Sequence, residues 1–366
     1  MINLYELEDI TLLPSPTNIG HPGNKINFQV KDESDITGIP ESLPIFTSPM
    51  ASIVGRSSAQ VYSSQGIKPI IPSTEPLQLR LDMCGLVFCA FTLSEVKRVF
   101  LDVHRQSNTQ FHICIDAGNG HDTNLLEICF KLKESYREQV EVMGGNVGLP
   151  EAYGLYSKAG FDYMRCGLAS GSLVDKAKYG FHYPMASLLE DIKTYKTSGP
   201  GKGLRPVKII CDGGITCPSD IIKAIALGAD YVMIGREFSK LIEAEGAIYQ
   251  KDKDQNGEVV FNQVDKSLLG QISGYQARVN GYCRPYYGNS TPEMRAKRAG
   301  YSNVDAWKKS HPRVKVKDAA WDWVSIDSTL SEWVAEFKHC VYYSFMMTGS
   351  LTWQDFKTNA KYGIQQ

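Results

Sequence analysis

The stretch from residue 207 to residue 238, VKIICDGGITCPSDIIKAIALGADYVMIGREF, sets two short apolar runs on either side of an amphipathic segment. The runs VKIICD and DYVMIG are continuously apolar rather than alternating, which is typical of strands buried on both faces of a parallel sheet. Between the two runs, Pro218 with Ser219 and Asp220 marks a helix start. The stretch therefore predicts a strand–helix–strand unit of an α/β fold.

The same pattern repeats through most of the chain. About eight apolar runs end in Gly, Asp or Asn and are followed by helix or loop, at 43–50, 68–74, 84–91, 111–120, 140–148, 161–171, 207–214 and 230–238. This count predicts a closed (β/α)8 TIM barrel, although an open doubly wound sheet would fit if two of the runs were not strands. In such a barrel the carboxyl ends of the strands carry the chemistry.

Bulk composition excludes several kinds of partner. The 366 residues carry a net charge of -1, so neither nucleic acid nor an anionic membrane is expected as a partner. The first residues do not form a signal peptide, and no apolar run reaches the roughly 18–20 residues of a membrane span. Nine scattered cysteines without zinc-site spacing indicate reduced thiols, no metal centre and a cytoplasmic location.

The pattern of the barrel stops after Phe238. Residues 239–325 are polar and rich in glycine, and KDQNGE at 253–258 predicts a hairpin turn. This segment is too long for a simple connection, so we expect a flap or lid over the site. A helical tail resumes at 328–349. We expect residues 1–366 to form a single barrel domain with a long flap insertion.

Three glycine-bearing loops follow neighbouring strands and predict an anion site. Glycines let backbone N–H groups converge on an anion, and a nearby serine adds a hydroxyl donor. Asp212, an acid at the end of an apolar strand, is placed to accept hydrogen bonds from two ribose hydroxyls. Tight turns alone could explain one such loop, but three with an acid and a serine favour a phosphate site. The loop residues are Gly167, Gly171, Ser172, Gly213, Gly214 and Gly235.

Five long motifs in order resemble the IMP dehydrogenase/GMP reductase family. They are PIFTSPMASIVG at 44–55, IDAGNGHD at 115–122, GGNVGLPEAYGLYSKAGFDYMRCG at 144–167, IICDGGITCPSDIIKAIALGADYVMIG at 209–235 and YYGNSTPEMRAKRAGY at 286–301. The segment DITLLPSPTNIG at 9–20 is similar to the amino-terminal segment of the family. DAGNGH, TCPSD and YYGNS favour GMP reductase, and the chain length leaves no room for the CBS domains common in the dehydrogenases.

The resemblance implies a purine mononucleotide site, a nicotinamide cofactor (NADPH or NADH) and a homotetramer. Met50 would support the base and Asp212 would hold the ribose. The phosphate would be bound by Ser172, Gly213, Gly214, Gly235 and either Tyr287 with Gly288 or Tyr286, and Arg236 would add a charge. The cofactor would lie along Asp116, Asn119, Gly120, Gly145 and Asn146. A monovalent cation at the loop 167–171 is also expected.

The chain departs from the family where the chemistry occurs. The family cysteine that attacks the purine ring aligns with Val174 or Leu173, and the threonine after it with Asp175 or Val174. The usual acid after Met50 is Ala51, and a basic stretch is replaced by PSTE at 72–75. The family glutamate near the flap has no clear counterpart, although Asp318 and Asp322 lie in that part of the sequence.

We therefore expect a purine-nucleotide-binding oxidoreductase with altered chemistry that forms no covalent adduct. Asp175 and His182 are the candidates for general acid/base catalysis, with His121 and Lys176 also near the site. Cys166 and Cys217 are more simply explained as packed thiols than as replacement nucleophiles. Two alternatives stay open: a non-catalytic binder that regulates an active family member, and ordinary GMP reduction by a route that the residues do not reveal.

Overall fold

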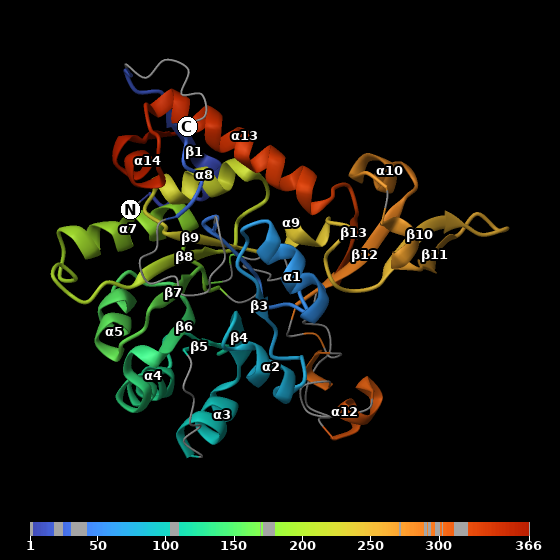
Figure 1. Cartoon of the computed structure of the whole chain (residues 1–366), viewed down its shortest axis with the longest axis horizontal. Helices are drawn as coiled ribbons and strands as arrows, with labels where there is room; N and C mark the ends of the chain where they lie inside the picture. The colour runs from blue at the N-terminus through green and yellow to red at the C-terminus, as the bar shows by residue number, and fades with distance from the viewer. Residues whose placement is uncertain are drawn as a thin grey trace.

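The computed structural model describes residues 3–17, 25–30, 42–102, 110–168, 170, 180–270, 272–288, 291, 294–296, 301, 303–310 and 321–365. An eight-stranded parallel sheet with strand order β2-β9-β8-β7-β6-β5-β4-β3 forms its centre (Figure 1). The strands are β2 (Ile45–Thr47), β3 (Ile70–Ile71), β4 (Phe88–Phe91), β5 (Phe111–Ile115), β6 (Val140–Val147), β7 (Tyr163–Cys166), β8 (Lys208–Asp212) and β9 (Tyr231–Ile234).

The sheet closes into a barrel between its first and last members. Lys68, just before β3, forms a parallel bridge with Phe46 of β2. The backbone N–H of Thr47 donates to the carbonyl of Lys68, and the N–H of Lys68 donates to that of Ile45. All eight predicted apolar runs contain a barrel strand, so the (β/α)8 prediction is confirmed and the open-sheet alternative is wrong.

Helices on the outside of the barrel connect its strands. They are α1 (Arg56–Ser64), α2 (Leu77–Met83), α3 (Leu93–Val96) with a π-helical turn (Lys97–Asp102), α4 (Thr123–Tyr136) with a 3-10 turn (Arg137–Gln139), α5 (Ala152–Ala159), α7 (Met185–Thr197) and α8 (Pro218–Ala226). Pro218 occupies the first turn of α8, as the sequence predicts. The largest apolar core lies between these helices and the strands, while a second cluster, including Phe46, Phe88 and Tyr163, fills the barrel interior.

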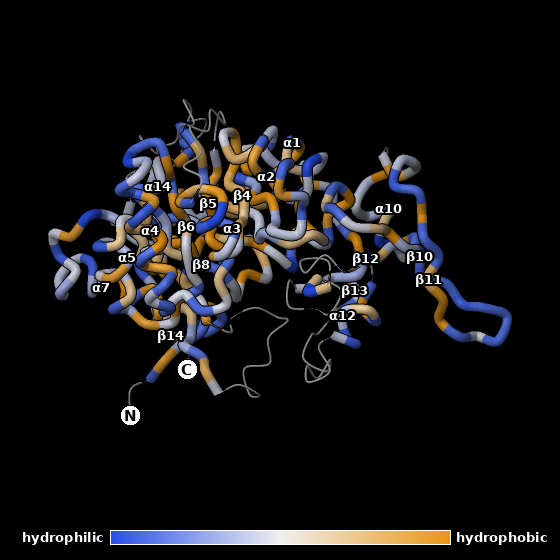
Figure 2. Tube along the Cα trace, turned by 90° about the horizontal axis from the view of Figure 1, so that it is seen from below, coloured by the Kyte–Doolittle hydropathy of each residue, from blue (hydrophilic) through white to orange (hydrophobic). Residues whose placement is uncertain are grey.

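An antiparallel four-stranded sheet follows the short helix α9 (Arg236–Ser239). Its strand order is β11-β10-β12-β13, and Figure 2 shows the β10–β11 hairpin projecting from the barrel with a largely hydrophilic tip. The turn at 254–258 joins β10 and β11, as predicted. The elements are β10 (Ile248–Lys253), β11 (Val259–Val264), a 3-10 turn (Lys266–Leu269), α10 (Gly274–Val279), β12 (Tyr282–Tyr287), α12 (Val304–Ser310) and β13 (Trp321–Ser325).

The two ends of the described chain meet beside the barrel. Strand β1 (Ile10–Leu13), which follows a 3-10 turn (Leu7–Asp9), pairs with the last strand, β14 (Lys361–Ile364). The predicted helical tail is α13 (Leu330–Thr348), which begins at a capping box of Thr329 and Glu332 and is followed by α14 (Trp353–Asn359). Among the helices that the structure describes, none is both long and apolar enough to cross a bilayer.

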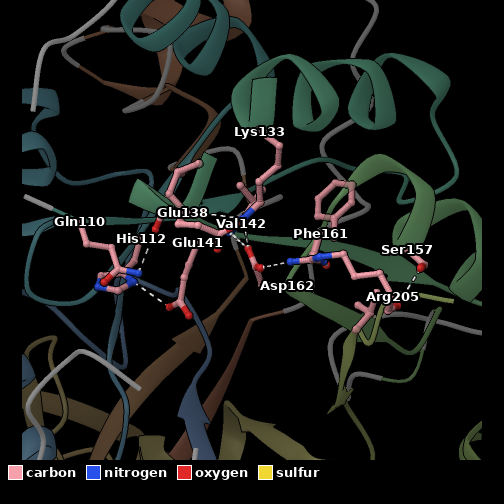
Figure 3. Close-up of polar contacts among 12 residues, drawn as sticks. Gln110, His112, Lys133, Glu138, Glu141, Val142, Ser157, Phe161, Asp162 and Arg205 are labelled. Atoms are coloured by element: carbon pink, nitrogen blue, oxygen red, sulfur yellow. Dashed lines mark hydrogen bonds and ion pairs between the residues drawn. The ribbon is translucent and has the colours of Figure 1, made fainter. Parts of the chain in front are cut away.

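We call the end of the barrel at the amino ends of its strands the floor, and the opposite end the mouth. On the floor, Asp162 accepts hydrogen bonds from Lys133 Nζ at 2.6 Å, Arg205 Nη2 at 2.5 Å and the N–H of Val142 at 2.7 Å (Figure 3). Nearby, His112 Nδ1 lies 2.9 Å from Glu141 Oε2, and both side chains are buried. These contacts tie β5, β6 and β7 together where the strands begin.

Candidate active site at the barrel mouth

Asp212 ends β8 at the mouth and forms the centre of a buried polar network. Its Oδ2 accepts hydrogen bonds from Arg165 Nε at 3.0 Å, Arg165 Nη2 at 2.8 Å and Asn146 Nδ2 at 2.8 Å. Burial by itself would lower the pKa of Arg165, but the carboxylate of Asp212 raises it above its ordinary value, so the guanidinium stays charged. Asp212 Oδ1 has no hydrogen-bond partner among the described residues. The carboxylate is therefore fixed through Oδ2, while Oδ1 remains available as an acceptor.

Glycines bring the loops after β7 and β8 into contact. Gly167 has φ +129° and Gly213 has φ +118°, a region that favours glycine. A Cβ on Gly167 would lie 2.4 Å from the carbonyl oxygen of Asp212, and one on Gly213 would lie 2.8 Å from Cβ of Ser170. Both glycines are therefore required by close packing. Gly214, with φ +75°, is less crowded, since the nearest atom to an added Cβ is 3.7 Å away.

Tyr286 of β12 reaches the end of β9 at the mouth. Its hydroxyl lies 3.8 Å from the sulfur of Met50, and a Cβ added to Gly235 would lie 2.9 Å from that hydroxyl. Tyr286 is buried, whereas the next residue, Tyr287, is half-buried and pairs along the backbone with Trp321. Of the two tyrosines that the sequence leaves open, Tyr286 is the one in contact with the strand end.

Arg236 connects the barrel mouth to the antiparallel sheet. Its Nη2 lies 2.7 Å from Oδ2 of Asp322 on β13, and its guanidinium carbon lies 5.9 Å from the ring centre of Tyr286. Both ends of the ion pair are partly exposed, at 36% for Arg236 and 52% for Asp322. Asp322, one of the two acids noted in the sequence near the flap, therefore lies at the edge of the mouth, while Asp318 is outside the described residues.

The residues expected along the cofactor lie at the ends of β5 and β6. Asp116 Oδ2 accepts a hydrogen bond from the hydroxyl of Ser73 at 2.8 Å, and the N–H of Gly120 donates to the carbonyl of Asn146. A Cβ on Gly120 would lie 2.4 Å from the carbonyl oxygen of Asn146, and one on Gly145 would lie 2.5 Å from the carbonyl oxygen of Arg165. Strand packing therefore accounts for these two glycines. Asn119 is exposed, and its Oδ1 accepts from the N–H of His121.

The two histidines near the mouth have structural partners. Nε2 of His121 accepts a hydrogen bond from the N–H of Gly148 at 3.0 Å, and burial lowers the pKa of this imidazole. Nδ1 of His182 lies 3.2 Å from the carbonyl of Leu168, and Nε2 lies 2.7 Å from Oε1 of Glu6. The second oxygen of Glu6 accepts from the N–H of Met185, so His182 and the start of α7 are held by the same carboxylate.

Two of the cysteines near the mouth are packed thiols. Cys166 and Cys114 are fully buried, and burial raises the pKa of Cys166 well above its ordinary value and that of Cys114 to about 11. Thiols of this kind are poor nucleophiles because little thiolate is present. Cys217 is half-buried before α8, with its sulfur 3.0 Å from the hydroxyl of Ser219.

Part of the predicted site lies outside the described residues. This applies to the phosphate serine Ser172, to Leu173 and Val174 at the cysteine position, and to Asp175 and Lys176. Gly171 of the expected cation loop lies outside as well. Among the residues that are described, no cluster of His, Cys, Asp and Glu side chains could hold a metal ion.

Arg165 is the principal site residue that sequence analysis misses. It stands inside the apolar run YMRC of β7, and a charged residue within a buried strand is a signal that could have identified it. Ser170 and Ser48 are also missed, because nothing in their local sequence indicates that they lie beside Gly213 and Gly235.

Comparison with known proteins finds matches to one family. Residues 97–260 match the IMP dehydrogenase / GMP reductase domain. The GMP reductase of Vibrio cholerae serotype O1 is 32% identical over 181 residues, which cover 48% of this chain and 50% of the relative. The GMP reductases of Bacillus licheniformis (27% over 288 residues) and Streptococcus pyogenes serotype M4 (28% over 289 residues) align over 75% of this chain and 80% and 79% of their own lengths. The chain thus spans about half of the Vibrio relative and about four fifths of the other two.

Proposed function

We propose, from the match of residues 97–260 to the IMP dehydrogenase / GMP reductase domain and from the alignments with GMP reductases, that this chain is a member of that family and that its barrel mouth binds a purine nucleoside monophosphate. The observation that carries the proposal is the fixed carboxylate of Asp212, whose Oδ2 is held by Arg165 and Asn146. The other oxygen, Oδ1, has no partner among the described residues and can accept a hydrogen bond from a ribose hydroxyl.

The phosphate of the nucleotide would lie between the ends of β8 and β9. Gly213, Gly214 and Gly235 supply backbone N–H groups there, with Ser172 as a further donor. The position of Tyr286 beside Gly235 favours the Tyr286 hydroxyl over a contribution from Tyr287 with Gly288. Met50, in contact with the same hydroxyl, would lie under the base.

Arg236 would add a charge-assisted contact to the phosphate. In the protein alone, its guanidinium pairs with the carboxylate of Asp322, which supplies the negative charge that a phosphate would otherwise provide. A bound nucleotide would therefore compete with Asp322 for Arg236. This competition would couple the phosphate to β13 of the antiparallel sheet, which supports the role of residues 239–325 as a flap.

We propose that the second half of the mouth accepts a nicotinamide dinucleotide, NADPH or NADH. When bound, this cofactor supplies or accepts a hydride. Asp116 and Asn146 present polar groups there, and Asn119 is exposed beside them. Open space around Gly118, where an added Cβ would meet nothing within 4 Å, fits a ligand along this loop. Gly120 and Gly145 would shape the surface of this half of the pocket.

The chemistry at the mouth would proceed without a covalent adduct. The family cysteine position holds Val174 or Leu173, and neither side chain can act as a nucleophile. The buried thiol of Cys166, with its raised pKa, is a poor replacement. The contacts of His182 with Glu6 and Leu168 favour a positioning role for its ring. Asp175 therefore becomes the stronger candidate for general acid/base catalysis on an altered purine substrate.

A non-catalytic nucleotide binder is the second candidate. The observation in its favour is that strand packing alone explains Gly120 and Gly145, so these glycines do not require a cofactor. A thermal-shift panel of purine nucleotides, with and without NADPH or NADH, separates the two. Stabilisation by nucleotide and dinucleotide together supports an oxidoreductase, whereas stabilisation by nucleotide alone supports a binder.

Absorbance at 340 nm tests the altered chemistry. We expect that neither GMP with NADPH nor IMP with NAD gives normal turnover, because loss of a nucleophile usually costs several orders of magnitude in rate. Robust turnover with either pair would contradict this part of the proposal and favour ordinary GMP reduction. A monovalent cation at the loop 167–171 would be revealed by a K⁺ dependence of nucleotide binding.

The proposal extends to a homotetramer, as the family resemblance implies, and to a cytoplasmic location, as the cysteine usage indicates. All nine cysteines are free thiols in the structure, which fits a reducing compartment. Light scattering of the purified chain tests the tetramer directly.

A further inference from the structure

Arg284 on β12 is a fully buried arginine where the antiparallel sheet meets the barrel. Its Nη1 donates to the carbonyls of Leu241 at 2.7 Å and Ser239 at 3.3 Å, and its Nη2 donates to that of Ile242 at 3.3 Å. These carbonyls belong to the end of α9 and the turn after it, next to β12 (Figure 1). One side chain therefore ties β12 to the segment that directly follows the barrel strand β9.

The charge of Arg284 is held without an ion-pair partner among the described residues. Burial lowers the pKa of this guanidinium to about 10, so it is still charged at neutral pH, and the charges of Glu243 and Glu245 act on it. Its Nε is buried and has no hydrogen-bond partner among the described residues. A lysine would avoid this unpaired donor, but it has no planar fork that could reach three carbonyls. The arginine therefore supplies a fixed geometry, at a cost in desolvation.

Tyr286 stands two residues after Arg284 on the same strand. Side chains two residues apart in a strand project to the same face, and both of these side chains are buried. The hydroxyl of Tyr286 lies 3.8 Å from the sulfur of Met50 and close to Gly235 at the mouth. The face of β12 that Arg284 holds is thus the face that carries this hydroxyl.

Among the described residues, backbone pairing holds the end of β12 on one side only. Strand β10 pairs with β12 at Tyr282 and Cys283, before Arg284. Strand β13 pairs with it from Cys283 to Tyr287, and β13 is itself an edge strand of the sheet. The position of Tyr286 therefore depends on an edge strand and on the contacts of the buried face, where Arg284 makes its three hydrogen bonds.

We propose that Arg284 is a positioning residue for the nucleotide site: it holds β12 against the end of α9 so that the hydroxyl of Tyr286 lies at the phosphate. The inference rests on the proposed phosphate site and gives Arg284 a role without contact to the ligand. Without the fork, a small displacement of β12 breaks the contact, because an O–H···O bond needs a separation of roughly 2.5–3.0 Å. The sugar contact at Asp212 would be kept.

Calorimetric titration of the whole chain with GMP and with guanosine measures the phosphate contribution as the ratio of the two affinities. Tyr286→Phe should lower this ratio about tenfold, the value of one hydrogen bond to a charged group. Arg284→Lys, which keeps the charge without the fork, and Arg284→Met, which keeps an unbranched chain without the charge, should lower it by a similar factor. In the Tyr286→Phe background, neither change should lower it further.

Arg80→Lys is the matched control. Arg80 is 2% exposed and also donates to two carbonyls, but it lies on α2, so the same substitution should leave the ratio of GMP to guanosine affinity unchanged. Urea unfolding of each variant shows whether it is folded before it is titrated.

An unchanged ratio in a folded Arg284 variant would overturn the proposal. So would a loss that adds fully to that of Tyr286→Phe, or an equal loss for GMP and guanosine, since either indicates a general effect on the fold. If both Arg284 variants fail to fold, hydrogen exchange of the wild-type chain decides. GMP but not guanosine should then slow exchange of the β12 backbone N–H groups, because a ligand stabilises the state that it binds, and equal exchange would overturn the proposal.

The wild-type titration separates this inference from the proposed function. If the wild-type chain binds GMP no more tightly than guanosine, the phosphate site fails and the role of Arg284 fails with it. A phosphate preference that persists in the Arg284 variants removes the positioning role alone.

Discussion

The two ends of the barrel both hold a carboxylate against basic side chains, but they leave those carboxylates in different states. On the floor, both oxygens of Asp162 are occupied, by Lys133, Arg205 and a backbone N–H. At the mouth, Oδ2 of Asp212 receives three hydrogen bonds, while Oδ1 receives none from the described residues. Asp162 therefore stabilises the fold, whereas Asp212 is held in place with one acceptor oxygen that no described residue uses.

Removing the floor carboxylate should have the largest effect on stability. Asp162→Ala leaves the N–H of Val142 without its acceptor and leaves Lys133 with the carbonyl of Val140 alone, in a partly buried setting, which costs about 2–3 kcal/mol. Urea unfolding measures this loss, and the nucleotide affinity of the folded fraction should be unchanged. Glu127→Ala is the matched control, since it removes an exposed ion pair with Lys131 and should not shift the unfolding midpoint measurably.

Removing the mouth carboxylate should affect binding instead. Asp212→Ala should weaken nucleotide affinity at least tenfold, roughly the value of one or two charge-assisted hydrogen bonds. Ser172→Ala should have a similar effect through the phosphate. Asp212→Asn, which keeps an acceptor oxygen next to Arg165, should separate lost ligand contacts from any loss of stability. Calorimetry that finds unchanged affinity in Asp212→Ala would remove this residue from the site.

Substitutions in the Arg236–Asp322 pair should change nucleotide affinity less. The change should be in opposite directions for the two residues. Asp322→Asn frees Arg236 for the phosphate and should tighten nucleotide binding about three-fold at low salt, because exposed ion pairs contribute little. Arg236→Ala should weaken binding, and in its background Asp322→Asn should have no further effect. If Asp322→Asn weakens binding, the two groups do not compete.

The smallest expected effect is a pH dependence at His121. Its pKa is lowered in the folded chain, so the folded state binds fewer protons than the unfolded state as the pH falls. The stability from neutral His121 is therefore complete above its ordinary pKa of about 6.5 and is lost as the pH falls through the lowered value. His121→Gln should reduce the change of the urea unfolding midpoint between pH 8 and pH 5. An equal change in both proteins would exclude His121 as the source of this pH dependence.

Sequence patterns predict the barrel well because parallel strands buried on both faces must be continuously apolar. The runs around Ile210 and Met233 carry that signal unambiguously, and the helix start at Pro218 is equally local. The turn at 254–258 follows from its Asn-Gly pair. Each of these features depends only on residues that are close together in the chain, so the local sequence is sufficient to predict it.

The site is less predictable because its contacts join distant strands. The pairing of Arg165 with Asp212 depends on which neighbours the barrel closure brings together, and the choice of Tyr286 over Tyr287 depends on which face of β12 meets the barrel. Two glycines show a second reason why the site is hard to predict. Gly120 and Gly145 match a ligand-binding motif, but the packing of strand ends requires glycine at both positions. Only the folded chain separates these two roles.

A crystal structure of the protein with GMP would test the central claim most directly. We expect the phosphate between Gly214 and Gly235, a ribose hydroxyl on Oδ1 of Asp212, and no bond from any sulfur to the purine ring. An empty mouth, or a thioether linking a cysteine to the base, would contradict the account.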